Sequence, residues 1–249
     1  MNDLLEGMNP VLEALRAGDR VSRIYLSRTA GNPRVRQLVE LARTRGVPVE
    51  EVDRARLRSM SASRNPQGVV AEVRPYGYFA LHDILQEACD SGQPPFLLVL
   101  DGVEDPQNLG AIIRTAECAG AHGVVIPRHG AARLSPAVAR AAAGALEYVK
   151  VAQETNLARA LDSLKEAGVY VVGTEAAASF LYTEVDLRGA VAVVVGGEER
   201  GIRRLVRERC DQLVRIPLAG RIGSLNAGVA CGIVAYEVVR QRSFQGAVP

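Results

Sequence analysis

Five short, nearly uninterrupted apolar runs between residues 96 and 217 limit the possible folds more than any other feature. They are FLLVL at 96–100, GVVIP at 123–127, VYVVG at 169–173, AVAVVVG at 190–196 and LVRIP at 213–217. Stretches with helical periodicity separate them. Runs that are apolar on both faces and alternate with helices form a parallel sheet covered on both sides. We therefore predict an α/β domain whose ligands bind beyond the carboxyl ends of these strands.

The first 75 residues contain shorter and more polar segments. VSRIYL at 21–26, VPVEEV at 47–52 and GVVAEV at 68–73 are predicted strands, and 34–46 is a predicted amphipathic helix. Pro75, Gly77 and the cluster SGQPP at 91–95 then interrupt the chain, around a helical stretch that reaches Cys89. We predict a small α+β domain over 1–75, a linker over 76–94 and the α/β domain over 95–249.

Composition narrows the class of protein. The chain has 249 residues, of which 48% are hydrophobic, but no apolar stretch approaches the roughly 18 residues of a membrane span. The N-terminus carries an acidic residue where a secretory signal has a basic one. Its four cysteines and three histidines lack the spacing of metal ligands. We expect a cytoplasmic protein with reduced thiols, no membrane segment and no metal.

Positive charge is concentrated in the N-terminal third. Residues 1–75 contain 13 arginines and nine acidic residues, whereas residues 76–249 contain 17 basic and 19 acidic residues. Arginine binds phosphate through two parallel hydrogen bonds, so this distribution weakly favours a nucleic-acid partner. A solvated, arginine-rich face would have the same composition.

Three polar loops follow predicted strands, and the first of them spans 101–120. Asn108 and Gly110 lie where the next helix is expected to begin, so Asn108 is a candidate helix cap and Gly110 permits a close approach. Arg114 interrupts the apolar run of that helix, which a purely structural role does not explain. This loop therefore contains a candidate functional arginine.

The second loop places Glu198 among Gly196, Gly197 and Gly201, directly after the most apolar strand. This GGEERG segment fits neither the GxGxxG dinucleotide motif nor the phosphate loop. Its carboxylate could reach a ligand or cap the next helix. The arginines of 203–209 that follow fit either a solvated face or an RNA contact.

The third loop, within 216–226, carries Ser224 and Asn226 just before a long helix of small apolar residues. Ser224 is a candidate helix cap. The helix itself suits burial or a subunit interface more than a cofactor site.

NLGAIIR, GGEERGI and IPLAGRIGSLNAGVACGIVAYE resemble, in this order, the three motifs of the SpoU branch of the SPOUT RNA methyltransferases. EGMNPVLEALRAG resembles the ribosomal-protein-like RNA-binding domain that precedes some members. The resemblance implies a parallel sheet with a C-terminal trefoil knot, a homodimer, and 2′-O-methylation of RNA with S-adenosylmethionine. It is closest to bacterial enzymes that act on a guanosine of 23S rRNA.

The resemblance also implies roles for individual residues. The cofactor-binding positions are Thr174, Gly196, Gly197, Ile216, Leu218, Ser224 and Leu225. The catalytic positions are Asn108, Arg114, Glu198, Ser224 and Asn226. Because a guanidinium with a pKa above about 12 is a poor base, we expect Arg114 to orient and stabilise charge. Asn108 would hold the ribose or Arg114, and Glu198 would fix Arg114 or the loop.

The sequence departs from the family pattern at two places and leaves two other functions open. Gly228 replaces a hydroxyl residue, which we expect to alter helix packing, and Glu199-Arg200 replaces smaller residues. The first alternative is the same chemistry on transfer RNA. The second is a non-catalytic RNA-binding or ribosome assembly protein of the same fold.

Overall fold

The computed structural model describes residues 3–27, 32–61 and 68–243. These residues form two compact units. The first unit comprises the described residues of 3–77 together with 133–148, and the second unit comprises 78–132 together with 149–243.

The first unit is built on a four-stranded sheet in the order β1-β4-β2-β3. Its strands are β1 (Asp3–Glu6), β2 (Val21–Ser27), β3 (Val49–Val52) and β4 (Val69–Val73). Its helices include α1 (Met8–Ala17), α2 (Pro33–Thr44) and α3 (Arg54–Met60). The three strands and the helix predicted from the sequence are confirmed. Strand β1 and helices α1 and α3 were not predicted.

A segment from the middle of the sequence, 133–148, completes this unit. It contains α6 (Pro136–Ala142) and the short helix η1 (Ala145–Glu147). The Tyr76 hydroxyl donates a 2.6 Å hydrogen bond to Glu147, and the Arg20 guanidinium carbon lies 3.4 Å from the centre of the Tyr76 ring. The sequence analysis did not associate this segment with the N-terminal residues, because its partners are distant in the chain.

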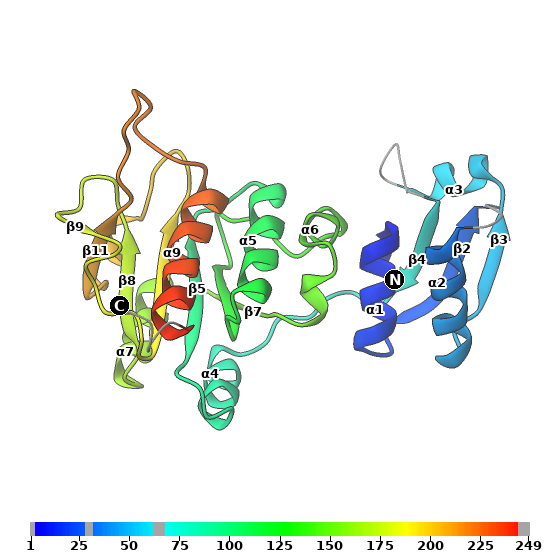
Figure 1. Ribbon diagram of the computed structural model, residues 1–249, viewed down its shortest axis with the longest axis horizontal. Coiled ribbons are helices and arrows are strands. Elements are labelled where there is room, and N and C mark those ends of the chain that lie inside the picture. Colours follow the sequence, from blue (N-terminus) through cyan, green and yellow to red (C-terminus); the bar gives the residue numbers. More distant parts are fainter. Residues whose placement is uncertain (1–2, 28–31, 62–67, 244–249) are drawn as a thin grey trace. The chain divides into compact units, whose positions relative to one another are not determined.

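The second unit contains a seven-stranded, wholly parallel sheet in the order β7-β6-β5-β10-β8-β11-β9 (Figure 1). Its strands are β5 (Phe96–Asp101), β6 (Gly123–Pro127), β7 (Lys150–Glu154), β8 (Tyr170–Thr174), β9 (Phe180–Leu181), β10 (Val191–Gly196) and β11 (Gln212–Arg215). The predicted α/β architecture and all five apolar strands are confirmed. The two edge strands, β7 and β9, were not predicted, because β7 contains polar residues and β9 is only two residues long.

Helices cover both faces of this sheet. They are α4 (Leu81–Asp90), α5 (Pro106–Cys118), α7 (Leu157–Glu166), α8 (Arg204–Arg207) and α9 (Ala227–Ser243). Figure 1 shows α5 and α9 side by side on one face. On the other face, α4 and α7 share a buried core with alternate residues of the central strands, such as Leu97, Val99 and Val194. The predicted linker, 76–94, includes α4, whose Leu81 and Ile84 belong to this core.

Two glycines at the end of β10 allow neighbouring backbones to touch. A Cβ on Gly197 would overlap the carbonyl oxygen of Gly102, and a Cβ on Gly196 would overlap the backbone of Gly201. The Gly197 N–H donates a 2.9 Å hydrogen bond to the Asp101 carbonyl. Any side chain at these positions would force the loops apart.

The trefoil knot stays a prediction.

We predict that Gly197→Ala lowers the free energy of unfolding by about 1 to 3 kcal/mol or more, because a methyl group there displaces backbone atoms. Gly189→Ala is the matched control, since nothing lies within 4 Å of a Cβ at that position. Chemical denaturation of both variants measures the difference. Equal stability of the two variants would contradict the close packing of these loops.

Candidate active site

A hydrogen-bonded network joins three polar residues from three separate loops at the carboxyl edge of the parallel sheet. Asn108 Nδ2 donates to Glu198 Oε1 at 2.9 Å, and Asn226 Nδ2 donates to the same oxygen at 2.5 Å. Asn226 Nδ2 also donates to Asn108 Oδ1 at 2.9 Å. These residues are 28 to 118 positions apart in the chain. The structure thus brings together three of the five predicted catalytic residues.

Asn108 belongs to this network because helix α5 begins earlier than predicted. The side chain of Asp105 accepts a 2.9 Å hydrogen bond from the Gln107 N–H and caps the helix, with Pro106 as its first residue. The prediction of Asn108 as the cap is therefore wrong. Since Asn108 lies within the first turn, its side chain is free to bond with Glu198.

Asn226, rather than Ser224, caps helix α9. Asn226 Oδ1 accepts hydrogen bonds from the backbone N–H groups of Gly228 at 3.0 Å and Val229 at 3.3 Å. The prediction of Ser224 as the cap is wrong. A Cβ at Gly228 would lie 3.2 Å from Asn226 Oδ1 and 3.8 Å from the Cβ of Ala111 on α5. The glycine at 228 therefore leaves room for the cap where α9 meets α5.

A pocket of about 210 Å³ adjoins the network. Its lining includes all seven predicted cofactor-binding residues, namely Thr174, Gly196, Gly197, Ile216, Leu218, Ser224 and Leu225. Glu198 lines it as well, so the pocket and the network share a residue. Several other lining residues, such as Glu175, Arg200 and Ile202, were not predicted. Only their position within a few residues of a strand end could have indicated that they line a ligand pocket.

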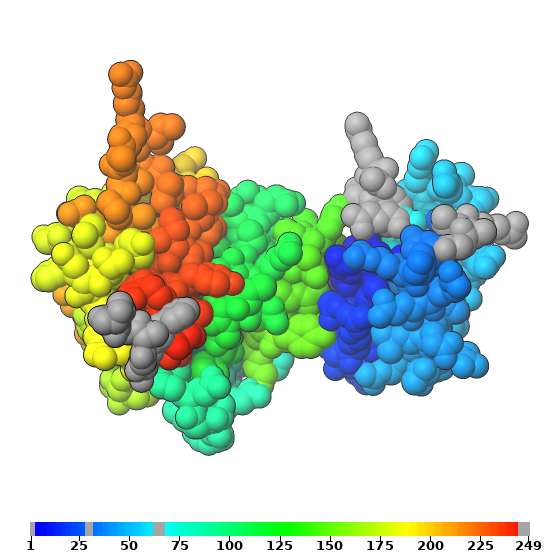
Figure 2. Space-filling model, viewed as in Figure 1, coloured from blue at the N-terminus to red at the C-terminus, as the bar shows by residue number. Residues whose placement is uncertain are grey.

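Two polar side chains of this pocket are held by neighbouring elements. Thr174 Oγ1 donates a 3.2 Å hydrogen bond to the carbonyl of Val194 on the adjacent strand. Glu175 accepts a 3.0 Å hydrogen bond from Arg207 on α8. The segment after β11, orange in Figure 2, borders the pocket and stands out from the surface of the second unit. The pocket thus has one fixed wall and one exposed wall.

The loop that carries Glu198 is anchored at its far end by a buried carboxylate. Asp101 is fully buried, and its two oxygens accept hydrogen bonds from the Arg203 backbone N–H and Nε, both at 2.7 Å. Because a buried carboxylate needs charged or hydrogen-bonding partners, Arg203 and Asp101 hold each other in place. This anchor fixes the loop between β10 and α8.

Arg114 lies outside the network. Its side chain is exposed on α5 and makes no hydrogen bond or ion pair with another described residue. Glu198 accepts hydrogen bonds from the two amides and not from Arg114, so its predicted role of fixing the loop stays a prediction. Cys118 is exposed on the same helix, but partial desolvation raises the pKa of its thiol, and a hydrogen bond to Glu117 adds to the shift. Cys118 is therefore a neutral thiol and a poor nucleophile at neutral pH.

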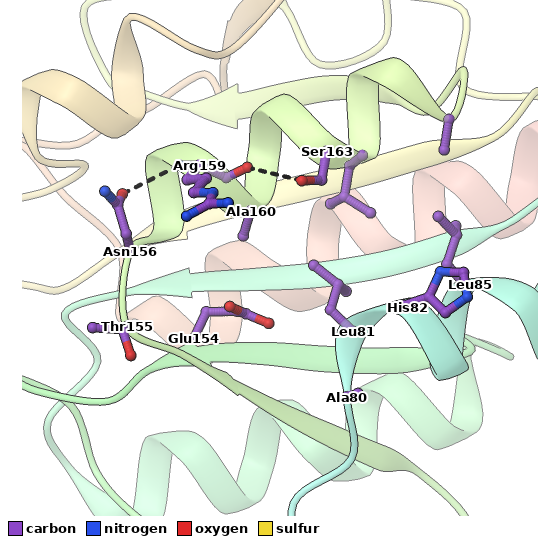
Figure 3. Close-up of a pocket in the computed structure, with 12 residues that line it drawn as sticks. Ala80, Leu81, His82, Leu85, Glu154, Thr155, Asn156, Arg159, Ala160 and Ser163 are labelled. Carbon is purple, nitrogen blue, oxygen red and sulfur yellow. Dashed lines mark hydrogen bonds between the residues drawn. The ribbon is translucent and has the colours of Figure 1, made fainter.

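A larger hollow, of about 490 Å³, lies between α4 and α7 on the opposite face of the sheet (Figure 3). Leu81, Leu85 and Leu164 contribute to its lining, together with polar residues such as Asn156 and Arg159. None of the predicted site residues lines it.

Among residues 3–27, 32–61 and 68–243 there is no cluster of His, Cys, Asp or Glu suited to a metal ion. No helix of these residues is long and apolar enough to cross a membrane.

Family comparisons match both units. The model described as the SpoU rRNA Methylase family matches residues 95–236, and that for RNA 2′-O ribose methyltransferase substrate binding matches residues 4–79. A Bacillus subtilis protein named as a TrmH family tRNA/rRNA methyltransferase is 42% identical over 242 residues, which are 97% of each chain.

Two further relatives are more specifically named. A Pseudomonas syringae 23S rRNA (guanosine-2′-O-)-methyltransferase is 44% identical over 227 residues, covering 90% of this chain and 89% of the relative. The crystal structure of the SpoU methyltransferase AviRb from Streptomyces viridochromogenes, in complex with AdoMet, matches with a TM-score of 0.80 and 26% identity. That match covers 98% of this chain and 91% of AviRb.

The network predicts a specific response to Asn226→Asp. The new carboxylate retains the cap oxygen but turns the donor to Glu198 into a second negative charge, so we expect a loss of about 1 to 3 kcal/mol of stability. Asn32→Asp is the matched control, because Asn32 caps α2 through a 3.0 Å hydrogen bond from Arg34 N–H, and Asn and Asp cap almost equally well. Urea denaturation compares the two, and equal values would contradict the network.

Proposed function

The chain belongs to the SpoU rRNA methylase family, and we propose that it transfers a methyl group from S-adenosylmethionine to a ribose 2′-oxygen of RNA. The target is a guanosine of 23S rRNA, as in the name of the Pseudomonas syringae relative. The observation that carries the proposal is the meeting of the 210 Å³ pocket with the Asn108–Glu198–Asn226 network at one edge of the sheet. A non-catalytic protein would have no need of both.

The residues of the pocket suit S-adenosylmethionine. Apolar side chains such as Val214, Ile202 and Ile216 can flank an adenine ring, while Thr174 and Ser224 offer hydroxyl groups. Glu198 places a carboxylate beside the pocket, which favours the positive sulfonium group. The volume is below the roughly 300 to 1,000 Å³ of typical ligand pockets. We therefore expect the exposed segment 217–224 to shift when the cofactor binds.

The chemistry requires alignment and charge stabilisation rather than a metal. When bound, the cofactor supplies an electrophilic methyl group, and the ribose 2′-oxygen must approach it in line. Asn108 and Asn226, fixed by Glu198, are rigid hydrogen-bonding groups at the pocket rim. The free guanidinium of Arg114 would stabilise the negative charge that develops on the 2′-oxygen.

The first unit would bind the RNA, as the family model over 4–79 indicates by its description. A relative is named for both tRNA and rRNA, so transfer RNA is the alternative substrate.

The chain has four free cysteines, one of them buried. Reduced thiols together with a ribosomal substrate favour a cytoplasmic location.

We also propose that the protein acts as a homodimer through α9. The first ten residues of this helix, 227–236, carry no charged side chain, but α5 and β10 cover only part of them, and Val229 and Tyr236 remain 52% and 51% exposed. Helices with apolar residues all round are normally buried. A second copy of this face would cover these side chains.

Incubating purified protein with labelled S-adenosylmethionine and in vitro transcribed 23S rRNA tests the function. We expect label on the 2′-oxygen of one guanosine and none on transfer RNA. In the same assay, Arg114→Ala should lower kcat about 10²- to 10³-fold without changing the Kd for the cofactor. Arg188→Ala is the control, since Arg188 is exposed and paired with Asp186. Label on transfer RNA alone would favour the alternative substrate, and no label on either would refute the proposal.

The dimer predicts that Tyr236→Glu yields a monomer in sedimentation velocity, because a carboxylate would be buried without a partner. Phe180→Glu is the matched control, since Phe180 has a similar exposed fraction of 48% and lies on the edge strand β9 rather than on α9. A wild-type monomer at micromolar concentration, or equal effects of both substitutions, would contradict the proposed interface.

A further inference from the structure

The second unit contains two classes of arginine, which differ in whether the protein itself supplies a hydrogen-bond acceptor for the guanidinium group. Six arginines make no side-chain hydrogen bond or ion pair with any described residue, and all six belong to segments that leave the carboxyl ends of strands. They are Arg114, Arg128, Arg159, Arg200, Arg215 and Arg221. All except Arg215, which is half-buried, are exposed.

These free arginines are distributed over several strands. Arg128 directly follows β6, and Arg159 lies in the first turn of α7, which follows β7. Figure 3 shows Arg159 beside Asn156, the residue that caps α7. Arg200 follows β10 and lines the 210 Å³ pocket, and Arg221 lies in the exposed segment after β11. The free guanidinium groups therefore occur at the same edge as the pocket and the network.

Basic residues near the amino ends of the strands have partners instead. Arg188 forms two short hydrogen bonds with Asp186 just before β10, and Arg209 pairs with Asp162 just before β11. Lys165 pairs with Asp211, and Lys150 pairs with Glu87. Arg242 donates to the backbone carbonyls of Pro94, Pro95 and Gly189. No described basic residue at this edge is left without an acceptor.

The same criterion separates the free arginines from the arginine-rich stretch 203–209, which the sequence left open as an RNA contact. Each of its four arginines has an acidic partner. The pairs are Arg203–Asp101, Arg204–Glu208, Arg207–Glu175 and Arg209–Asp162. The arginines of this stretch thus form intramolecular ion pairs, which favours a structural role over contact with RNA.

The carboxyl edge is not uniformly positive, because Glu104, Glu154 and Glu199 lie on the same loops. The carboxyl edge therefore does not present a continuous positive electrostatic surface to a polyanion. Individual guanidinium groups without partners are better suited to discrete contacts, since each can bind one phosphate through two parallel hydrogen bonds.

We propose that three of the exposed, unpaired arginines of the carboxyl edge, Arg128, Arg159 and Arg221, bind phosphodiester groups of the RNA strand that carries the target ribose. This inference rests on the proposed function. Phosphate contacts fix the position of a nucleic acid without reading its sequence. They would hold the substrate against the catalytic unit after the first unit has selected it.

Binding of in vitro transcribed 23S rRNA at several potassium chloride concentrations tests the inference, with Arg128→Ala, Arg159→Ala and Arg221→Ala as separate variants. Each lost phosphate contact should weaken binding several-fold and reduce the slope of log Kd against log salt by about 0.7 to 0.9. Arg188→Ala and Arg209→Ala are matched controls that remove a paired arginine, and their slopes should equal that of the wild type. Cofactor Kd, measured by calorimetry, should be the same for all five variants.

The outcomes separate this inference from the function on which it rests. A wild-type protein that neither binds nor methylates the RNA would refute the proposed function. If the wild type does both, but the three edge variants keep its slope, the inference is overturned. It is also overturned if Arg188→Ala and Arg209→Ala lower the slope as much as the edge variants do, because charge alone would then account for the loss.

Discussion

One carboxylate oxygen, Glu198 Oε1, holds the site together. It accepts hydrogen bonds from Asn108 Nδ2, Asn226 Nδ2 and, at 3.4 Å, the Ala227 N–H. An ionised carboxylate is an acceptor only, with room for several donors, so two amide groups can converge on it without competing. Through this oxygen the loops after β5, β10 and β11 form one structure, and both the pocket and the start of α9 depend on it.

The parallel sheet makes this convergence possible, and backbone contact makes it tight. All strands of the second unit end at one edge, so every loop that follows a strand begins there. Gly196 and Gly197 lack the Cβ atoms that would separate these loops. Asp101, fully buried at the end of β5, anchors the same region through Arg203. Rigid loops of this kind keep polar groups oriented before a substrate arrives.

The two edges of the parallel sheet differ in how their basic side chains are paired. At the amino edge of the sheet, basic side chains are paired with acidic residues or hydrogen-bonded to backbone carbonyls of the protein, as in Arg188–Asp186 and Arg242–Gly189. At the carboxyl edge, exposed arginines such as Arg128 and Arg221 have no such acceptors. A surface guanidinium without a partner keeps its full hydrogen-bonding capacity for a ligand. The edge with the pocket is thus also the edge prepared for an anion.

The five central strands and the identity of the polar loops follow from local patterns in the amino-acid sequence, namely apolar runs and glycine-rich turns. Its motifs also predicted the residues now found around one pocket. The caps Asp105 and Asn226 are local interactions within three residues, and the structure selects them over the neighbouring candidates Asn108 and Ser224. Tertiary packing alone places 133–148 with the N-terminal residues, keeps Arg114 apart from Glu198 and pairs particular arginines. Such features depend on partners as far as 102 residues away, as in Arg203–Asp101, and local periodicity contains no information about which distant groups a side chain will meet.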